Sequence, residues 1–222
     1  GLYLFKPEII IHAAATKYVQ LSEKYPFETV ETNILGSMNI VRVSKEIKCK
    51  IVIGISTDKS AQPIENLYGL SKAISERIFL SQNNLKSKTK FACVRFGNIA
   101  WSSGSVFHIW KKMIDIDGKI STTGPDMKRF FFSINEATSL VVRAIDKINK
   151  INGKILVLKM KSAYIKEILE IYSSIYKCKW KKTKNRIGDK KHEFLVSENE
   201  LPYSSKINVD NKEHFIISPL EK

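Results

Sequence analysis

Two residues four positions apart, Tyr68 and Lys72, are the first whose types and spacing could do chemistry. If they lie on a helix, they are one turn apart on the same face. An ammonium close to a phenol favours the phenolate, which lowers the phenol pKa from about 10 toward neutrality. A phenolate can accept the proton of a hydroxyl group while hydride leaves the same carbon. By itself, however, the spacing is more typical of a surface helix with a solvated lysine.

The residues that precede this pair strengthen the chemical interpretation. Residues 51–55 are an apolar, β-branched run that predicts a strand buried on both faces. The run ends in a polar cluster containing Thr57, Asp58 and Lys59, and residues 67–82 follow as a predicted helix. In an open parallel α/β sheet, ligands bind at the carboxyl ends of the strands. We therefore expect a phenol, a carboxyl group and two amines to gather at this edge of the sheet.

Composition and charge are those of an ordinary globular chain. The 222 residues are 43% hydrophobic and 27% charged, which allows one or two domains with a real core. No apolar run approaches the roughly 18 residues of a membrane-spanning helix, and no signal peptide opens the chain. The net charge of +15 comes from lysines that are dispersed outside residues 177–191, without an aromatic-interleaved RNA motif. We expect no nucleic-acid partner, no membrane contact by this chain and a cytoplasmic location.

The three cysteines, Cys49, Cys93 and Cys178, are far apart in the sequence. They lack the CxxC spacing of zinc sites and the density of a disulfide framework. Free thiols in a reducing compartment are the simplest interpretation, and no bound metal is expected.

Three segments carry a family resemblance: STDK at 56–59, Pro63, and NLYGLSK at 66–72. Together they resemble the active-site segment of extended short-chain dehydrogenases that act on nucleotide sugars. Within that group, the chain is most similar to the UDP-N-acetylglucosamine 4,6-dehydratases of polysaccharide and flagellar-sugar biosynthesis. The resemblance extends over nearly the whole chain and includes RFGN at 95–98 and RIGDKKHE at 186–193.

The resemblance implies an α/β fold, a Rossmann-like, doubly wound parallel sheet that binds NAD(P), with a small C-terminal substrate-binding lobe. We expect a partial Rossmann domain over residues 1–160, with a substrate-lobe insertion around 100–130, and the C-terminal lobe over 161–222. No G-x-x-G-x-x-G precedes a helix in this sequence. The chain is therefore expected to be a fragment that lacks roughly the first two or three strands of such a domain.

Hydrophobic patterns predict the remaining elements. Strands are expected at residues 9–11, 91–96 and 155–158, the first buried and the last closing the sheet. Ser133 with Glu136 forms a capping box that opens a helix over 134–149. A further amphipathic helix covers residues 165–175. A long helix over 27–48 is expected to bury its apolar positions, which are Val30, Ile34, Met38, Val41 and Ile47.

The resemblance also implies ligand contacts. The cofactor is NADP, with NAD as the alternative, and a UDP-sugar is the substrate. The Arg186 guanidinium suits the pyrophosphate of UDP, because it can pair bidentately with phosphate oxygens. The implied cofactor contacts are Ala13, Thr32, Asn33, Tyr68, Lys72, Ile99, Ala100, Trp101, Ser102 and Ser103. The implied substrate contacts are Lys17, Asn98, Val106, Thr123, Arg186 and Asp189.

The implied reaction is loss of water from the sugar. Tyr68, helped by Lys72, accepts the proton of the hydroxyl on carbon 4, and Thr57 hydrogen-bonds near that carbon. Lys59, as a neutral amine, takes the hydrogen on carbon 5, and protonated Asp58 donates to the departing hydroxyl on carbon 6. A tyrosine at position 68 favours the branch that also inverts carbon 5.

Two alternatives stay open at this point. A nucleotide-sugar epimerase or reductase of the same fold would keep Tyr68 and Lys72 but would not need Asp58 beside Lys59. A non-catalytic remnant would need none of the four. In either enzymatic case a homo-oligomer is expected.

Overall fold

The computed structural model describes residues 1–83, 87–184 and 188–219, and it divides into two compact units. The sheet unit contains residues 1–96, 138–159 and 194–222, and the small unit contains residues 97–137 and 160–193. These boundaries differ from the expected division at residue 160. Residues 194–219 return to the sheet unit, and the small unit takes its chain from two separate segments.

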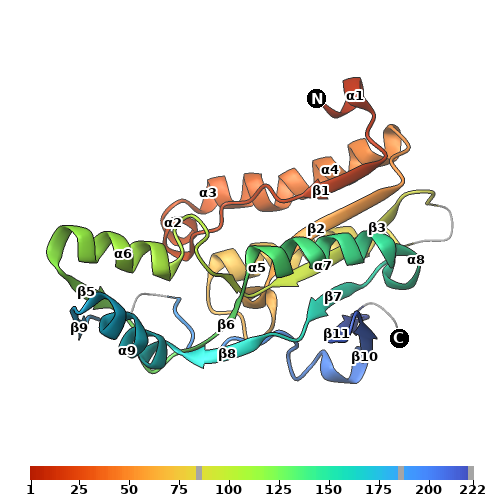
Figure 1. Cartoon of the computed structure of the whole chain (residues 1–222). Helices are drawn as coiled ribbons and strands as arrows, with labels where there is room; N and C mark the ends of the chain where they lie inside the picture. The colour runs from red at the N-terminus through yellow and green to blue at the C-terminus, as the bar shows by residue number, and fades with distance from the viewer. Residues whose placement is uncertain (84–86, 185–187, 220–222) are drawn as a thin grey trace. The chain divides into compact units, whose positions relative to one another are not determined.

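A six-stranded sheet forms the core of the sheet unit, in the order β1-β2-β3-β7-β11-β10 (Figure 1). β1 (Ile9–His12), β2 (Ile51–Thr57), β3 (Lys90–Phe96) and β7 (Ile155–Leu158) run parallel, which agrees with the predicted strands. β11 (Lys212–Ile217) pairs antiparallel with β7, and β10 (Ser204–Val209) with β11. The prediction that residues 155–158 close the sheet was wrong, because a C-terminal hairpin adds two strands beyond β7.

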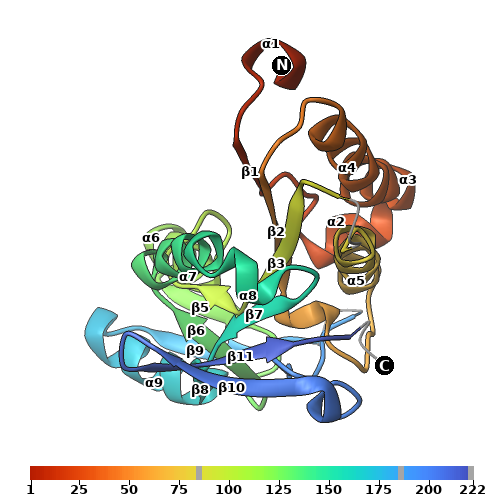
Figure 2. The ribbon, with the colours of Figure 1, turned by 90° about the vertical axis from the view of Figure 1, so that its right-hand side faces the viewer.

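Helices cover both sides of the parallel strands, and Figure 2 shows α4 (Gly36–Glu46) and α5 (Leu67–Leu80) on one side with α8 (Ile148–Ile151) on the other. The predicted helix over 67–82 is confirmed as α5. The predicted helix over 134–149 is α7 (Ile134–Asp146) followed by α8, with the capping box in place, since Ser133 N–H bonds Glu136 Oε2 at 2.9 Å. Because both faces of β2 are covered, most of its side chains are buried, as predicted.

Short helical segments complete the sheet unit. They are α1 (Leu2–Phe5), α2 (Val19–Lys24), α3 (Pro26–Thr29), the π-helical turn η1 (Val30–Leu35), and the 3-10 turns η2 (Asp58–Ser60) and η3 (Leu201–Tyr203). α3, η1 and α4 are continuous and correspond to the predicted helix over 27–48.

This helix buries Val41, one of its predicted apolar positions, but polar residues fill much of its buried side. Asn33, Ser37 and Ser44 are fully buried, whereas Met38, an expected core position, is 51% exposed. Asn33 and Ser37 face α5, where Asn33 Nδ2 lies 2.9 Å from Ser71 Oγ and Ser37 Oγ lies 2.6 Å from Ser75 Oγ. Small hydroxyl side chains let two helices approach closely and bond to each other, so this contact is polar and the hydrophobic pattern does not find it.

β1 also differs from its prediction as a buried strand. Ile10 is 7% exposed, but Ile9 and Ile11 are 43% and 50% exposed. β1 is an edge strand of the described sheet, and only its alternate residues face the packed helices.

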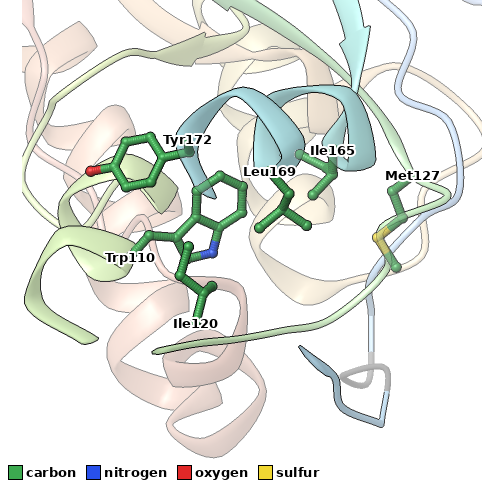
Figure 3. Close-up of a cluster of buried hydrophobic side chains, with 6 residues drawn as sticks. All are labelled: Trp110, Ile120, Met127, Ile165, Leu169 and Tyr172. Atoms are coloured by element: carbon green, nitrogen blue, oxygen red, sulfur yellow. The ribbon is translucent and has the colours of Figure 1, made fainter. Parts of the chain in front are cut away.

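The small unit has its own hydrophobic core. β4 (Asn98–Ile99), β6 (Lys128–Phe132) and β8 (Lys161–Tyr164) form one sheet, and β5 (Lys119–Thr122) pairs with β9 (Lys179–Lys182). α6 (Val106–Asp117) and the predicted helix α9 (Ile165–Tyr176) complete the unit. Figure 3 shows the cluster that holds it together, which consists of Trp110, Ile120, Met127, Ile165, Leu169 and Tyr172.

Candidate active site

The polar cluster after β2 forms a tight turn, called here the 57–60 turn. β2 ends at Thr57, and η2 begins at Asp58. Asp58 is fully buried, and its Oδ1 accepts hydrogen bonds from Lys59 Nζ at 3.0 Å and Thr57 Oγ1 at 3.1 Å. Its other oxygen, Oδ2, is buried with no hydrogen-bond partner among the described residues. A buried carboxyl oxygen without a partner is costly, so this atom is a candidate for contact with a ligand.

The start of α5 is held directly against this turn. Asn66 caps the helix, because its Oδ1 accepts a hydrogen bond from Gly69 N–H at 2.7 Å. A Cβ atom on Gly69 would lie 2.3 Å from the carbonyl oxygen of Lys59. Only glycine allows this approach, and the approach brings Tyr68, the preceding residue, to the 57–60 turn.

Tyr68 meets the groups of the turn. Burial raises the pKa of Tyr68, and the Lys59 ammonium and a hydrogen bond with Thr57 act in the opposite direction. The charged neighbour that lowers the pKa of Tyr68 is Lys59, while assistance from Lys72 stays a prediction. Tyr68, Thr57, Asp58 and Lys59 therefore converge on one place, as the sequence predicts, through contacts that spacing along a helix does not reveal.

Lys72 lies deeper, with 3% of its surface exposed. Burial lowers the pKa of Lys72, while the nearby Glu76 carboxylate raises it. Burial and, after it, the Lys72 ammonium lower the pKa of His12, at the end of β1. Among the described residues, Lys72 donates no hydrogen bond to another side chain, which leaves it able to bind hydroxyl groups of a ligand.

Asn33 secures the loop that follows β1. Its Oδ1 accepts from Thr16 N–H at 2.8 Å, and its Nδ2 lies 3.2 Å from Thr16 O and 2.9 Å from Ser71 Oγ. Because these contacts use both ends of a fully buried amide, Asn33 can shape a cofactor site only through the loop. Thr32 is exposed.

The loop itself presents small and basic groups. Ala13, next to the end of β1, is exposed, and Lys17 places its Nζ 5.3 Å from the centroid of the Tyr18 ring. The exposed Ala13 lets a ligand approach the backbone closely, and the buried Lys72 can donate hydrogen bonds to ribose hydroxyl groups. Both features fit the nicotinamide-ribose end of a dinucleotide. The glycine-rich motif for its pyrophosphate is not in this sequence.

The remaining predicted ligand contacts lie in the small unit. Asn98 Nδ2 donates to Phe130 O at 3.0 Å. The backbone of Trp101 is in the left-handed region, and its side chain, 57% exposed, stacks on the Phe107 ring with 5.5 Å between the centroids. Thr123 Oγ1 and Asp189 Oδ2 are 3.5 Å apart, so two predicted substrate contacts are neighbours. Ala100, Ser102 and Ser103 lie in the loop between β4 and α6, where Ser102 Oγ donates to Ile99 O. Val106 is the first residue of α6. Arg186 lies outside the described residues.

Sequence reasoning missed several buried polar groups near the turn. Arg95, in β3, is fully buried and pairs with Glu76 of α5 and with Glu200. Ser60, the last residue of η2, contacts Glu76. An arginine inside an otherwise apolar strand was the available signal, because a buried guanidinium requires carboxylate partners.

Fold and site together define the class of protein: an α/β fold with a mixed, mainly parallel sheet, shared with NAD-dependent dehydratase structures. The chain belongs to the polysaccharide biosynthesis protein family, whose model matches residues 2–215. No helix within the described residues is both long and apolar enough to span a bilayer.

Individual relatives include two kinds of enzyme. The chain is 31% identical over 215 residues to a UDP-N-acetylglucosamine 4,6-dehydratase (inverting) of Campylobacter jejuni, covering 96% of this chain and 62% of that protein. It is 35% identical over 198 residues to a UDP-glucose 4-epimerase of Rickettsia bellii, covering 87% and 57%. The crystal structure of Pen from Bacillus thuringiensis matches with a TM-score of 0.88 at 32% identity, covering 97% and 66%.

The chain thus spans about three fifths of the length of these two enzymes. Other solved structures with this fold, at 17% identity, have NAD or NADPH bound.

Proposed function

We propose that this chain supplies the catalytic groups of an NADP-dependent dehydratase that converts a UDP-N-acetylhexosamine to its 4-keto-6-deoxy product, with inversion at carbon 5. One observation carries the proposal: Lys59 Nζ contacts Asp58 Oδ1 at 3.0 Å beside Tyr68. Elimination of water needs a base and an acid next to each other. Removal of a single hydroxyl proton, as in a 4-epimerase, does not need an adjacent acid and base.

The first role belongs to Tyr68, which accepts the proton of the hydroxyl on carbon 4. The Lys59 ammonium and the Thr57 hydroxyl stabilise the resulting charge on the phenol oxygen, against the effect of burial. Lys72, from its buried position, contributes by binding hydroxyl groups of the ligand. NADP, when bound, would supply a hydride acceptor next to carbon 4 and, once reduced, a hydride donor for carbon 6, with no net change in the cofactor.

The second role belongs to the pair of Asp58 and Lys59. Transfer of a proton from Lys59 Nζ to Asp58 Oδ1 along their hydrogen bond converts an ion pair into a neutral amine and a carboxylic acid. These are the two forms that elimination requires: the amine takes the hydrogen on carbon 5, and the acid donates to the hydroxyl leaving carbon 6. A bound sugar that displaces water favours the neutral pair, because a low-dielectric site penalises separated charges.

The substrate contacts are proposals of the same standing. Lys17 on the loop after β1, Asn98, Val106, Thr123 and Asp189 in the small unit, and Arg186, which lies outside the described residues, are assigned to the UDP-sugar. The cofactor residues are assigned to NADP as the resemblance implies, with Asn33 acting through the 13–17 loop. The family's role in polysaccharide biosynthesis supports a sugar nucleotide as the substrate class.

The test uses the full-length protein with UDP-N-acetylglucosamine in heavy water, followed by mass spectrometry of the product. We expect loss of one water and incorporation of deuterium at carbon 5. Lys59→Ala and Asp58→Asn should each abolish water loss, whereas Lys50→Ala, which removes an exposed lysine paired with Glu8, should leave turnover unchanged. Intact water loss in either active-site variant would refute the assigned roles.

A 4-epimerase is the second candidate, because a relative 35% identical to this chain carries that activity. Its product would have the same mass as its substrate and would carry no deuterium at carbon 5. It would also tolerate Asp58→Asn, since Tyr68 alone would exchange the proton on the carbon 4 hydroxyl.

A further inference from the structure

Arg95 is the centre of a buried ionic network in the sheet unit. Its Nε and Nη2 bond the two carboxylate oxygens of Glu76 at 3.0 and 2.9 Å. Its Nη1 and Nη2 bond the two oxygens of Glu200, both at 2.9 Å, and Nη1 also bonds Leu195 O at 2.9 Å. All five N–H donors of the guanidinium are thus used within the protein.

One arm of the network reaches the 57–60 turn. Ser60 Oγ lies 2.8 Å from Glu76 Oε1 and 2.6 Å from Thr57 O, so it joins the carboxylate to the backbone of the turn. Arg95 is also the partner of Ser56 in the register between β2 and β3. The guanidinium is therefore linked to the turn through Glu76 and Ser60.

The other arm reaches the C-terminal segment 194–200. Ser197 donates to Glu200 Oε2 from its N–H at 2.9 Å and from its Oγ at 3.0 Å, which fixes that carboxylate. Asn199 Nδ2 bonds Gln62 Oε1 at 2.7 Å, in the loop that joins the turn to α5. The segment is thus attached at two points to the stretch of chain that carries the candidate catalytic groups.

We propose that Glu76, Arg95 and Glu200 form a positioning network that fixes the 57–60 turn, so that segment 194–200 helps to align Asp58 with Lys59. Stability alone is a poor explanation, because buried ion pairs add little net stability compared with apolar packing. What they add is directional bonds, and the bonds here end on the turn. The kinetic part of the test rests on the proposed function, whereas its structural part does not.

The experiment compares Glu200→Gln, Ser60→Ala and their double variant with Asp210→Asn in the full-length protein. Asp210 lies in the hairpin that follows segment 194–200 and pairs with Arg143 at 2.8 Å, but among the described residues it has no bond to the turn, so it is the control. Amide hydrogen exchange at Lys59 and Ala61 measures the order of the 57–60 turn and does not require catalysis. These N–H groups bond Thr57 Oγ1 and Asp58 O, respectively.

We expect exchange at these two amides to be roughly tenfold faster in Glu200→Gln and Ser60→Ala, and unchanged in Asp210→Asn. With UDP-N-acetylglucosamine, kcat should fall about ten- to a hundredfold with KM within about twofold. The double variant should lose no more than the more severe single variant, because both act through one path.

Unchanged exchange and unchanged kcat in Glu200→Gln would overturn the inference, as would additive losses in the double variant. If Glu200→Gln does not fold, Ser60→Ala alone decides, by the same two measurements. A wild-type protein without dehydratase activity would refute the proposed function but would leave the exchange result to decide the role of the network.

Discussion

His12 should make the stability of this fold depend on pH. It lies at the carboxyl end of β1 with 6% of its surface exposed, and its Nε2 is 3.4 Å from Ser37 Oγ. Burial, together with the Lys72 ammonium, lowers the pKa of His12 from 6.5 to about 4. The unfolded chain therefore binds a proton that the folded chain does not accept until the pH is near 4. Stability is present in full above the unfolded pKa and falls as the pH decreases through this window.

The size of the effect follows from the two pKa values. A change from 6.5 to about 4, at about 1.36 kcal/mol per pKa unit, corresponds to about 3 kcal/mol of unfolding free energy. His12→Gln keeps a polar group of similar size near Ser37 and does not titrate. Between about pH 7 and pH 4, the wild type should lose about 3 kcal/mol more than this variant.

Urea unfolding of the full-length protein, followed by tryptophan fluorescence, measures this difference. Carboxylates titrate in the same range, but they do so in both proteins and cancel in the comparison. His192→Gln, at an exposed histidine, is the control and should keep the wild-type pH dependence. Equal slopes for wild type and His12→Gln, or a His12 imidazole resonance that titrates near its ordinary pKa, would refute the reasoning.

Three further changes test other parts of the structure. Gly69→Ala should reduce kcat by about a hundredfold or more, because its Cβ would lie 2.3 Å from Lys59 O. Gly36→Ala, whose Cβ would have its nearest atom at 3.6 Å, should leave kcat unchanged. Similar rates for both variants would contradict the close approach. Asn33→Ala should lower the unfolding free energy by about 3 kcal/mol in urea titrations, since it leaves buried polar groups unpaired, and a loss under about 1 kcal/mol would argue against this role. Cys178 is half-buried, whereas Cys49 and Cys93 are buried. Cys178→Ser should therefore remove the one thiol of this chain that reacts with Ellman's reagent in the folded protein. Undiminished labelling would contradict this.

Local signals were sufficient for the elements that carry the site. β2 was predicted because an apolar, β-branched run suits a strand covered on both faces, and α5 because its pattern follows the helical period. The capping box at Ser133 depends on two side chains three residues apart, so it too can be predicted from sequence. In each case the determining contacts lie within a few residues of each other.

Contacts between distant segments were beyond the pattern. The helix over 27–46 buries Asn33 and Ser37 because α5 presents serines opposite them, and nothing in the periodicity of either helix alone indicates this. The C-terminal hairpin joins β7 through antiparallel pairing across more than 50 residues of chain. Sequence reasoning gave no strands there, since neither strand alternates regularly between buried and exposed residues, and regular alternation is the signal that predicts a strand.

The amino-acid sequence by itself determined which chemical groups are present and in what order a strand, a turn and a helix present them: a threonine, a carboxyl group and an amine, then a phenol. Only the tertiary structure decided that Lys59 lies close enough to lower the pKa of Tyr68, and that Glu200 reaches the turn through Arg95 and Glu76. The physical reason is that charges interact through space. Distance and burial set their strength, and both depend on how segments far apart in the chain pack together.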